Sequence, residues 1–265
     1  KLIHCKNKID SKDINTKWDN AKKLSNSFEL IYLPNKKNRI NSIASYQPLS
    51  RSYFKLWELI FDFDLLKTEN KLNILCLAEG PGGFIEAIVN FRKKQNIKDN
   101  IYGISLKSQN KDIPGWKKSQ YFLKNNPNII ITYGEDGTGN LYNINNINFL
   151  KKIISNKSEF ITADGGFDFS INFNKQEELS YRIIFCEIVA ALNNQKIEGV
   201  FICKIFDINT LITQKMIYLL SNFYEKVYIT KPLTSRPANS EKYVICKNFK
   251  GIQSDINNMM YRSYE

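Results

Sequence analysis

The chain has 265 residues, 43% of them hydrophobic, which is enough to bury a sizeable core and argues against a disordered protein. Its formal net charge of +12 aids solubility and also suits a polyanionic partner such as nucleic acid, two explanations that charge alone does not separate. No apolar run is long enough to span a bilayer and no signal peptide begins the chain, so an intracellular protein that does not enter membranes is expected.

The cysteines and the single histidine limit the chemistry that the chain can perform. The five cysteines are far apart in sequence, and the only histidine is His4, which excludes a zinc site of the CxxC type. Acid–base chemistry must therefore use carboxylates, lysines or tyrosines. Cys76, Cys203 and Cys246 lie in apolar runs, which predicts reduced cysteines inside the core.

Apolar periodicity predicts a polar N-terminal region, up to about residue 52, followed by alternating helices and strands. Phe54, Trp57, Phe61 and Leu65 recur at helical spacing and begin this pattern. The expected helices are 52–67, 83–94 (with basic residues in its last turn), 147–155, 177–195 and 211–223. The expected strands are 71–79, 100–106, 128–134, 159–164, 199–206, about 225–230 and 242–247.

Most of these strands are apolar throughout, which is typical of a parallel sheet covered by helices on both faces. The last two strands are joined without an intervening helix, so they are expected to form an antiparallel pair at the edge of the sheet. The pattern therefore predicts an α/β fold of the doubly wound, Rossmann-like type.

A glycine-rich turn joins the first of these strands to the helix that follows it. The sequence LCLAEGPGGF (75–84) places Glu79 before Gly80, Gly82 and Gly83. Glycines let a backbone approach a ligand closely, and a helix N-terminus offers free N–H groups. Ligands of doubly wound sheets bind at the carboxyl ends of the strands, so this turn is a candidate cofactor site.

The residues after the next two strands limit which cofactor can bind. The second strand ends at Ser105 and Leu106 without the acidic residue that holds the ribose of a dinucleotide, which weighs against NAD. No GxxxxGK[ST] motif is present, so there is no phosphate loop for ATP. In the polar loop 133–140, Asp136 and Asn140 could bind a nucleoside, although a solvated turn would have the same composition.

Four charged residues lie beside or inside apolar segments. Lys55 lies in the first helix, Asp164 ends the fourth strand, Lys204 lies within the strand FICKIFD (201–207), and Glu241 precedes the last strand. A charge near the end of a buried strand is costly unless it is paired, so Lys204 is the hardest of the four to explain as a surface residue. For Asp164, which two glycines follow, a plain turn is the alternative.

Asp164, Lys204 and the glycine-rich turn all fall at carboxyl ends of strands and are expected to face one crevice. Partial burial beside a second lysine would lower the pKa of Lys204, and a carboxylate could orient the amine. A neutral amine in such a place could deprotonate or steer a hydroxyl nucleophile.

The order of these motifs resembles that of the FtsJ-type RNA ribose 2′-O-methyltransferases, from about Ser50 to Gly251. The motifs are Lys55, AEGPGGF (78–84), YGEDGTGN (133–140), TADGGFD (162–168), FICKIFD (201–207) and KPLTSRPANSEKYVICKNFKG (231–251). Within that family the chain is most similar to the cap-specific mRNA enzymes of eukaryotes and their viruses. The resemblance implies a largely parallel seven-stranded Rossmann-like sheet with an antiparallel last pair. It also implies S-adenosyl-L-methionine as methyl donor, S-adenosyl-L-homocysteine as product, and no required metal.

The resemblance also implies roles for individual residues. It assigns a catalytic Lys-Asp-Lys-Glu tetrad to Lys55, Asp164, Lys204 and Glu241. The cofactor site is expected to comprise Glu79, Gly80, Pro81, Gly82, Gly83, Phe84, Ser105, Leu106, Asp136, Asn140 and Asp164. RNA contacts are expected at Arg39, Ser50, Arg51, Asn174, Ser235, Arg236 and Asn239. Trp116 and Tyr46 are candidates for stacking on the cap base, with a packing role as the alternative. Many relatives have aspartate at the place of Asn140, and some have alanine at that of Glu79.

The implied reaction is transfer of a methyl group to a ribose 2′-OH at the capped 5′ end of mRNA. The alternatives are a 2′-O-methyltransferase of ribosomal or transfer RNA, a non-catalytic RNA-binding subunit on the same fold and, behind both, an NAD enzyme. Three regions are expected: an N-terminal extension over 1–52 that contributes to RNA and cap binding, a methyltransferase domain over 53–251, and a C-terminal tail over 252–265.

Overall fold

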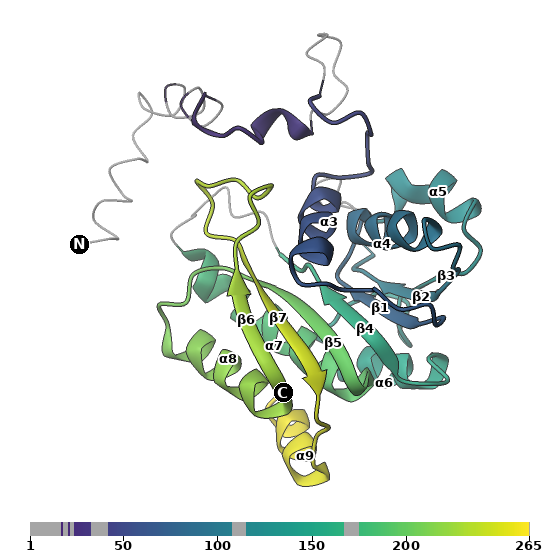
Figure 1. The fold of residues 1–265 in the computed structure, drawn as a ribbon. Helices are drawn as coiled ribbons and strands as arrows, with labels where there is room; N and C mark the ends of the chain where they lie inside the picture. The colour runs from purple at the N-terminus through teal and green to yellow at the C-terminus, as the bar shows by residue number, and fades with distance from the viewer. Residues whose placement is uncertain are drawn as a thin grey trace.

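The computed structural model describes residues 17, 21, 24–32, 42–107, 115–166 and 175–264. Its centre is one seven-stranded sheet with helices packed on both faces (Figure 1). In the part of the chain that is described, no helix is both long enough and apolar enough to cross a membrane.

The sheet has the strand order β3-β2-β1-β4-β5-β7-β6. Its strands are β1 (Asn73–Leu77), β2 (Asn100–Ile104), β3 (Ile129–Thr132), β4 (Ser158–Ala163), β5 (Gln195–Ile205), β6 (Tyr224–Thr230) and β7 (Lys242–Phe249). Strands β1 to β5 pair in parallel, whereas β7 runs antiparallel to both β5 and β6. The predicted fold class, including the antiparallel last pair, is confirmed.

The α-helices are α3 (Ser52–Asp62), α4 (Gly83–Lys93), α5 (Gln120–Lys124), α6 (Ile144–Ile153), α7 (Gln176–Asn194), α8 (Leu211–Phe223) and α9 (Ser254–Arg262), and the 3-10 turns are η1 (Glu29–Ile31) and η2 (Lys117–Ser119). Helix α3 ends five residues before the predicted boundary, because Asp64 and Leu66 have positive φ angles that a helix cannot contain. Helix α9, within the predicted tail, is mostly polar and was not predicted. Its Met260 nevertheless lies in the core against α7.

Two hydrophobic cores lie on opposite faces of the sheet, because successive strand residues point to opposite sides. Ile74 and Cys76 of β1 contact the α3–α4 layer, and Leu75 and Leu77 contact the layer of α6 to α9. The same alternation directs Lys204 of β5 toward α3, since its neighbour Cys203 belongs to the opposite core. Cys76, Cys203 and Cys246 are buried and free, as predicted, and so is Cys186.

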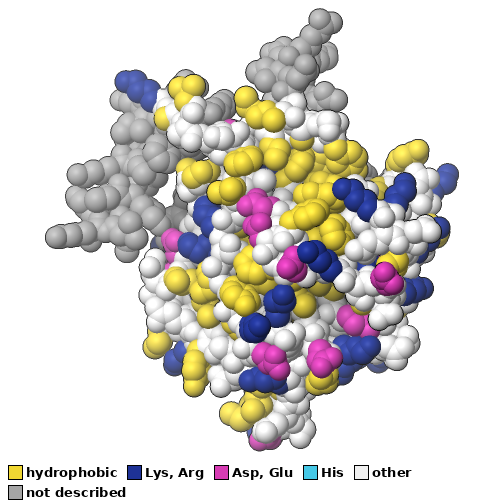
Figure 2. All heavy atoms as spheres, viewed as in Figure 1, with side chains coloured by type: hydrophobic (Ala, Val, Ile, Leu, Met, Phe, Trp, Pro, Cys, Tyr) yellow, Lys and Arg dark blue, Asp and Glu magenta, His cyan; other side chains and the backbone are white. Residues whose placement is uncertain are grey.

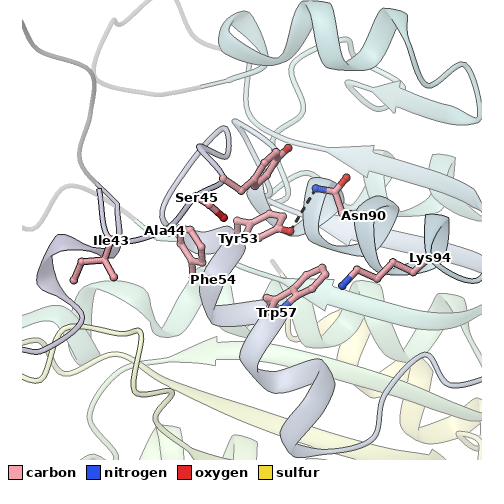
Figure 3. A pocket seen from close by; sticks show the side chains of 9 residues that line it. Ile43, Ala44, Ser45, Tyr53, Phe54, Trp57, Asn90 and Lys94 are labelled. Atoms are coloured by element: carbon pink, nitrogen blue, oxygen red, sulfur yellow. Dashed lines mark hydrogen bonds between the residues drawn. The ribbon is translucent and has the colours of Figure 1, made fainter. Parts of the chain in front are cut away.

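An aromatic hollow marks the outer surface of the α3–α4 layer. Figure 2 shows hydrophobic side chains gathered on this face. The hollow is lined by Ile43, Ala44, Ser45, Tyr46, Tyr53, Phe54, Trp57, Asn90 and Lys94 (Figure 3). The rings of Tyr53 and Trp57 stack with their centroids 5.5 Å apart, and the Lys94 ammonium lies 4.8 Å from the centroid of Trp57. The outer face of α3 is therefore apolar, whereas its inner face carries Lys55.

Candidate active site

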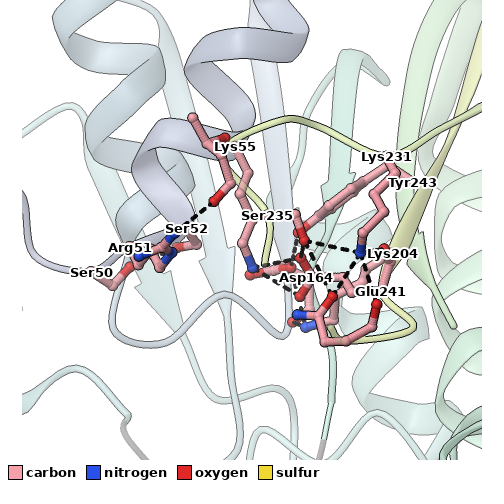
Figure 4. Close-up of polar contacts among 12 residues, drawn as sticks. Ser50, Arg51, Ser52, Lys55, Asp164, Lys204, Lys231, Ser235, Glu241 and Tyr243 are labelled. Carbon is pink, nitrogen blue, oxygen red and sulfur yellow. Dashed lines mark hydrogen bonds and ion pairs between the residues drawn. The ribbon is translucent and has the colours of Figure 1, made fainter. Parts of the chain in front are cut away.

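The structure brings the four predicted tetrad residues together at the carboxyl ends of the central strands (Figure 4). Asp164 follows β4 directly, and Lys204 is the penultimate residue of β5. Glu241 immediately precedes β7, which enters the sheet beside the end of β5 because the two strands are antiparallel. Lys55, from α3, completes the group.

The tetrad consists of two ion pairs. Lys204 Nζ lies 3.2 Å from Asp164 Oδ1 and donates a 2.8 Å hydrogen bond to the Asp164 carbonyl oxygen. Lys55 Nζ lies 2.7 and 2.8 Å from the two carboxylate oxygens of Glu241. All four side chains are at most 14% exposed, so their charges interact with little screening by solvent.

Three further side chains, from β7 and from the loop before it, support the tetrad. The Tyr243 hydroxyl donates to Asp164 Oδ1 at 3.0 Å, and the Ser235 hydroxyl donates to Glu241 Oε1 at 2.9 Å. Lys231 Nζ donates to the backbone oxygen of Glu241 at 2.8 Å. Sequence reasoning missed Tyr243 and Lys231. The first had a usable signal, because Tyr243 is two residues from Glu241 and so lies on the same face of the strand.

The electrostatics of the site correct one prediction. Burial lowers the pKa of Lys204, but the charges of Asp164 and Glu241 outweigh burial, so its pKa lies above the usual value rather than below it. The sequence suggested that a second lysine would dominate, whereas in the structure Lys55 is paired with Glu241. For Glu241, burial raises the pKa, but Lys55 and Lys204 bring it down to about 2. Lys204 and Glu241 are therefore charged in the protein at neutral pH.

The glycine-rich turn lies beside the tetrad and leaves one carboxylate oxygen without a partner. Gly82 precedes α4 with a φ of 102°, a conformation that favours glycine. Glu79 is 2% exposed, and its Oε1 accepts the Phe84 N–H at 2.7 Å. Its Oε2 is buried and has no hydrogen-bond partner among the residues that the structure describes. Burial, followed by the charge of Asp164, raises the pKa of Glu79 well above its usual value. An unpaired carboxylate here suits a bound group that is cationic or donates hydrogen bonds.

Ser105 connects this turn to the polar loop 133–140. Its hydroxyl accepts the N–H of Gly80 at 3.2 Å, and a Cβ on Gly139 would lie 2.0 Å from its backbone oxygen. Within the loop, Asp136 accepts hydrogen bonds from Thr138, Asn143 and Asn146, which hold the pKa of Asp136 below its usual range. The Asn140 side chain accepts the N–H of Tyr142 at 2.9 Å. Asp136 and Asn140 thus shape the loop, and Leu106, which is 39% exposed, lies at its margin.

The predicted RNA contacts are mostly used inside the protein. Arg51 donates to three backbone carbonyl groups, those of Phe28, Glu29 and Thr234, and so ties the N-terminal segment to the loop before β7. The Ser50 hydroxyl pairs with that of Ser52 beside Gly83, where a Cβ would clash with both. Asn239 accepts a 2.7 Å hydrogen bond from Lys231, and Ser235 supports Glu241 as described above.

Arg236 differs from these residues, since it is about half exposed although it pairs with Glu29 at 2.9 Å. Arg39 and Asn174 lie outside the described residues. Of the two candidates for stacking, Trp116 is buried next to Gly82, and Tyr46 is 44% exposed in the aromatic hollow.

The paired charges, the glycine-rich turn and the seven-stranded sheet together have the architecture of a Rossmann-like methyltransferase. Residues 48–249, which include the whole sheet and the tetrad, match the model of the FtsJ-like methyltransferase family. The chain belongs to this family. Among the described side chains, no group of three His, Cys, Asp or Glu residues is placed to hold a metal ion.

Several similar proteins carry the name cap-specific mRNA (nucleoside-2′-O-)-methyltransferase 1. The Mus musculus protein is 33% identical over 236 residues, which cover 80% of this chain and 27% of that protein. The Homo sapiens protein is 32% identical with the same coverage, and that of Trypanosoma cruzi is 36% identical over 176 residues, 65% of this chain and 46% of that protein. The chain therefore spans less than half the length of these relatives.

Solved structures show the same fold at lower identity. A Plasmodium falciparum protein assigned as a ribosomal RNA methyltransferase is 23% identical, with a TM-score of 0.52 over 77% of this chain and 99% of its own. A Listeria monocytogenes protein assigned as an S-adenosylmethionine-dependent methyltransferase is 12% identical, with a TM-score of 0.51 over 77% of this chain and 61% of its own. Both likenesses concern the fold.

Proposed function

We propose that this protein transfers a methyl group from S-adenosyl-L-methionine to a ribose 2′-OH at the capped 5′ end of mRNA. The observation that carries the proposal is the pair of ion pairs, Lys204–Asp164 and Lys55–Glu241, beside the glycine-rich turn. Such an arrangement can bind and orient a hydroxyl group next to a cofactor, and positioning is the main requirement when the methyl donor is already activated.

The residues at the turn fit this cofactor. The unpaired Oε2 of Glu79 suits a cationic group, and the φ of Gly82 lets the backbone approach closely. Glu79, Ser105 and the loop that carries Asp136 and Asn140 would hold the cofactor, which when bound supplies an activated methyl group on a sulfonium. S-adenosyl-L-homocysteine would then be the product.

Within the tetrad, we propose that Lys204 orients the ribose hydroxyl and then accepts its proton. With its pKa raised, Lys204 first donates a hydrogen bond that orients the hydroxyl oxygen. A cation held beside Asp164 would lower the pKa of Lys204, so that the ammonium releases one proton to solvent. The resulting neutral amine would then accept the proton of the ribose hydroxyl as the methyl group is transferred. Asp164 and Glu241 balance the positive charges of the two lysines. Lys55 fixes the position of Glu241 through its two short contacts.

Two observations support capped mRNA as the substrate. The relatives named above are cap-specific mRNA methyltransferases by name, and the net charge of +12 favours a polyanion. On this proposal 53–251 is the catalytic domain, 1–52 contributes to RNA binding and 252–265 is a C-terminal extension. Arg236 lies in the loop before β7, and its half-exposed side chain makes it a candidate for a phosphate contact.

The test is methyl transfer from labelled S-adenosyl-L-methionine to three short RNAs of one sequence, with an m7G cap, an unmethylated G cap or a 5′ triphosphate. We expect clear preference for the m7G-capped RNA, with the label recovered as a 2′-O-methylated nucleoside by mass spectrometry. Equal activity on all three RNAs would overturn the cap assignment and favour another RNA. No transfer despite normal RNA binding would point to a non-catalytic subunit.

A further inference from the structure

A buried glutamate that belongs to neither the tetrad nor the glycine-rich turn lies directly behind the site. Glu187 is on α7, on the face of the sheet opposite to α3. It is 0% exposed, on a helix whose buried residues, such as Ile183 and Val189, belong to the hydrophobic core. No ion pair to its carboxylate is formed by any residue that the structure describes. Burying a carboxylate without a cationic partner is costly, so the residue requires an explanation other than packing.

The carboxylate is used to bind one peptide group. Glu187 Oε1 accepts the N–H of Gly165 at 2.9 Å, and its Oε2 lies 4.0 Å from the Cys203 sulfur, which is a weak donor. A Cβ on Gly165 would lie only 2.2 Å from Glu187 Oε1. The glycine after Asp164 is therefore explained by the space that this carboxylate occupies.

The same peptide group is held at its other end by Lys204. The peptide that joins Asp164 to Gly165 contributes the carbonyl oxygen that accepts from Lys204 Nζ at 2.8 Å. In a trans peptide the C=O and N–H point in opposite directions. Lys204 on the α3 face and Glu187 on the α7 face thus fix one peptide plane between them, and that plane determines where Asp164 and Lys204 meet.

We propose that Glu187 is a positioning residue of the methyl-transfer site, which holds the Asp164–Gly165 peptide so that its carbonyl oxygen faces Lys204. This inference rests on the proposed function. Without the acceptor on α7, the Gly165 N–H would be buried and unpaired, and the peptide would rotate to find another partner. The Asp164 carbonyl would then leave Lys204, whose ammonium group would lose its shorter contact with Asp164.

The electrostatics of Glu187 agree with a hydrogen-bonding role rather than with a permanent charge. Burial raises the pKa of Glu187 to about 8, against the lowering effects of Lys204 and the Gly165 N–H. A carboxyl oxygen accepts the N–H in either protonation state, and so would the amide oxygen of glutamine. The conservative replacement is therefore expected to preserve the role.

The experiment compares Glu187→Gln, Glu187→Leu and the control Cys186→Ala in the full 265-residue chain. Cys186 is also buried on α7, so its truncation tests a packing defect without removing the acceptor. Glu187→Leu should lower kcat about 10- to 100-fold, with KM values for cofactor and RNA within about threefold of the wild type, because misplacement of a reacting group by about 1 Å can cost about 100-fold. Glu187→Gln should remain within about threefold of wild-type kcat, and Cys186→Ala should change thermal stability more than kcat.

Crystal structures of the variants supply a readout that does not depend on activity. In Glu187→Leu the Asp164 carbonyl should have turned away from Lys204, and in Glu187→Gln it should still face Lys204. Folded Glu187→Leu with kcat within twofold of the wild type, or an unrotated carbonyl, would overturn the inference. A loss of kcat in Glu187→Gln as large as that in Glu187→Leu would also overturn the inference.

Two further outcomes are covered by the same design. If the wild type transfers no methyl group, the proposed function fails, and the carbonyl orientation in Glu187→Leu still decides whether Glu187 positions the peptide. If Glu187→Leu does not fold, Gly165→Ala takes its place, because the added Cβ displaces the carboxylate from the N–H. The same loss of kcat is expected, and a folded Gly165→Ala with kcat within twofold of the wild type would contradict the inference.

Discussion

Two buried ion pairs lie at opposite ends of the central strands, and they differ in how completely their polar atoms are paired. Near the amino ends of β1 and β2, Arg92 contacts both oxygens of Asp99, at 2.7 and 3.0 Å, and each side chain is 1% exposed. The same guanidinium donates to the backbone oxygens of Leu66, Thr68 and Asn70 and to Gln95. Asp99 also accepts the N–H of Leu72, so every polar side-chain atom of Arg92 and Asp99 has a hydrogen-bond partner.

At the carboxyl ends of the strands the charges are paired less completely. The polar contacts that Lys204 Nζ makes with described residues, one ion pair and one hydrogen bond, both go to Asp164. The nearby Glu79 has a buried oxygen, Oε2, that has no hydrogen-bond partner among the described residues. Saturated pairing stabilises one structure, whereas polar atoms left available beside a glycine-rich turn suit ligands and reacting groups. The contrast agrees with a structural role for Arg92–Asp99 and with the proposed catalytic role of Lys204–Asp164.

Substitution of Lys204 should give the largest effect on activity. Lys204→Met keeps the volume and removes the group that orients the hydroxyl, so we expect methyl transfer to fall about 100- to 10,000-fold. Single-turnover transfer measures the loss, and calorimetric titration with S-adenosyl-L-homocysteine should show near-normal binding. Retention of more than a tenth of the wild-type rate would remove Lys204 from the mechanism.

Substitution of Arg92 should lower stability and leave the activity of the folded protein nearly unchanged. Arg92→Met leaves Asp99 buried without its cationic partner, which typically costs about 3–5 kcal/mol in the free energy of unfolding. Urea unfolding measures the cost, and transfer per folded molecule should stay within about threefold of the wild type. Arg92→Lys is the matched control, since it keeps the charge but loses most of the hydrogen bonds. If Arg92→Met lowered transfer per folded molecule by much more than threefold, the proposed difference in role between the two ion pairs would be wrong.

The two ends of the sheet were also unequally predictable from sequence. Asp164 and Lys204 could be placed together because carboxyl ends of parallel strands meet at one edge of a sheet, and a charge inside an apolar strand is conspicuous. Arg92 looked like an ordinary basic residue in the last turn of a helix. Its burial depends on the loop after α3 folding back over it, which no local pattern encodes.

Distances and exposure account for what sequence reasoning could not predict at the site itself. The direction of the Lys204 pKa shift was wrong, because it depends on how close Asp164 and Glu241 come relative to Lys55. Arg51 stays a predicted RNA contact, but no local pattern indicated that its guanidinium donates to three backbone carbonyl groups. Glu187 lies in a helix whose pattern is mostly apolar, and only the packed sheet reveals that it faces the end of β4.

The pH dependence of stability should reveal the charges at the tetrad. The pKa of Glu241 is lowered from 4.5 in an unfolded chain to about 2 in the fold, so its stabilising contribution is complete above about pH 4.5 and is lost as the pH falls toward 2. Glu241 alone should account for about 2 kcal/mol of the loss between pH 5 and pH 3. Urea unfolding at several pH values measures it, and Glu241→Gln should show a shallower decline. Equal slopes for the variant and the wild type would mean that Glu241 is not paired with Lys55 as observed.

Tyr243→Phe should have the smallest effect and tests how finely the functional pair is supported. The change removes only the hydroxyl that donates to Asp164 Oδ1 at 3.0 Å, and the ring remains packed against Phe84. Asp164 keeps its contact with Lys204, so folding should be nearly unaffected. Its negative charge would be less well oriented, and a hydrogen bond to a charged group contributes about 1.5–3 kcal/mol at most. We therefore expect kcat to fall about three- to tenfold with unchanged KM for the cofactor.

Tyr224→Phe is the matched control, because its hydroxyl contacts Gln195, away from the tetrad, and kcat should be unchanged. If both tyrosine variants lower kcat equally, the hydroxyl of Tyr243 acts through general packing, and Asp164 is held by Lys204 alone.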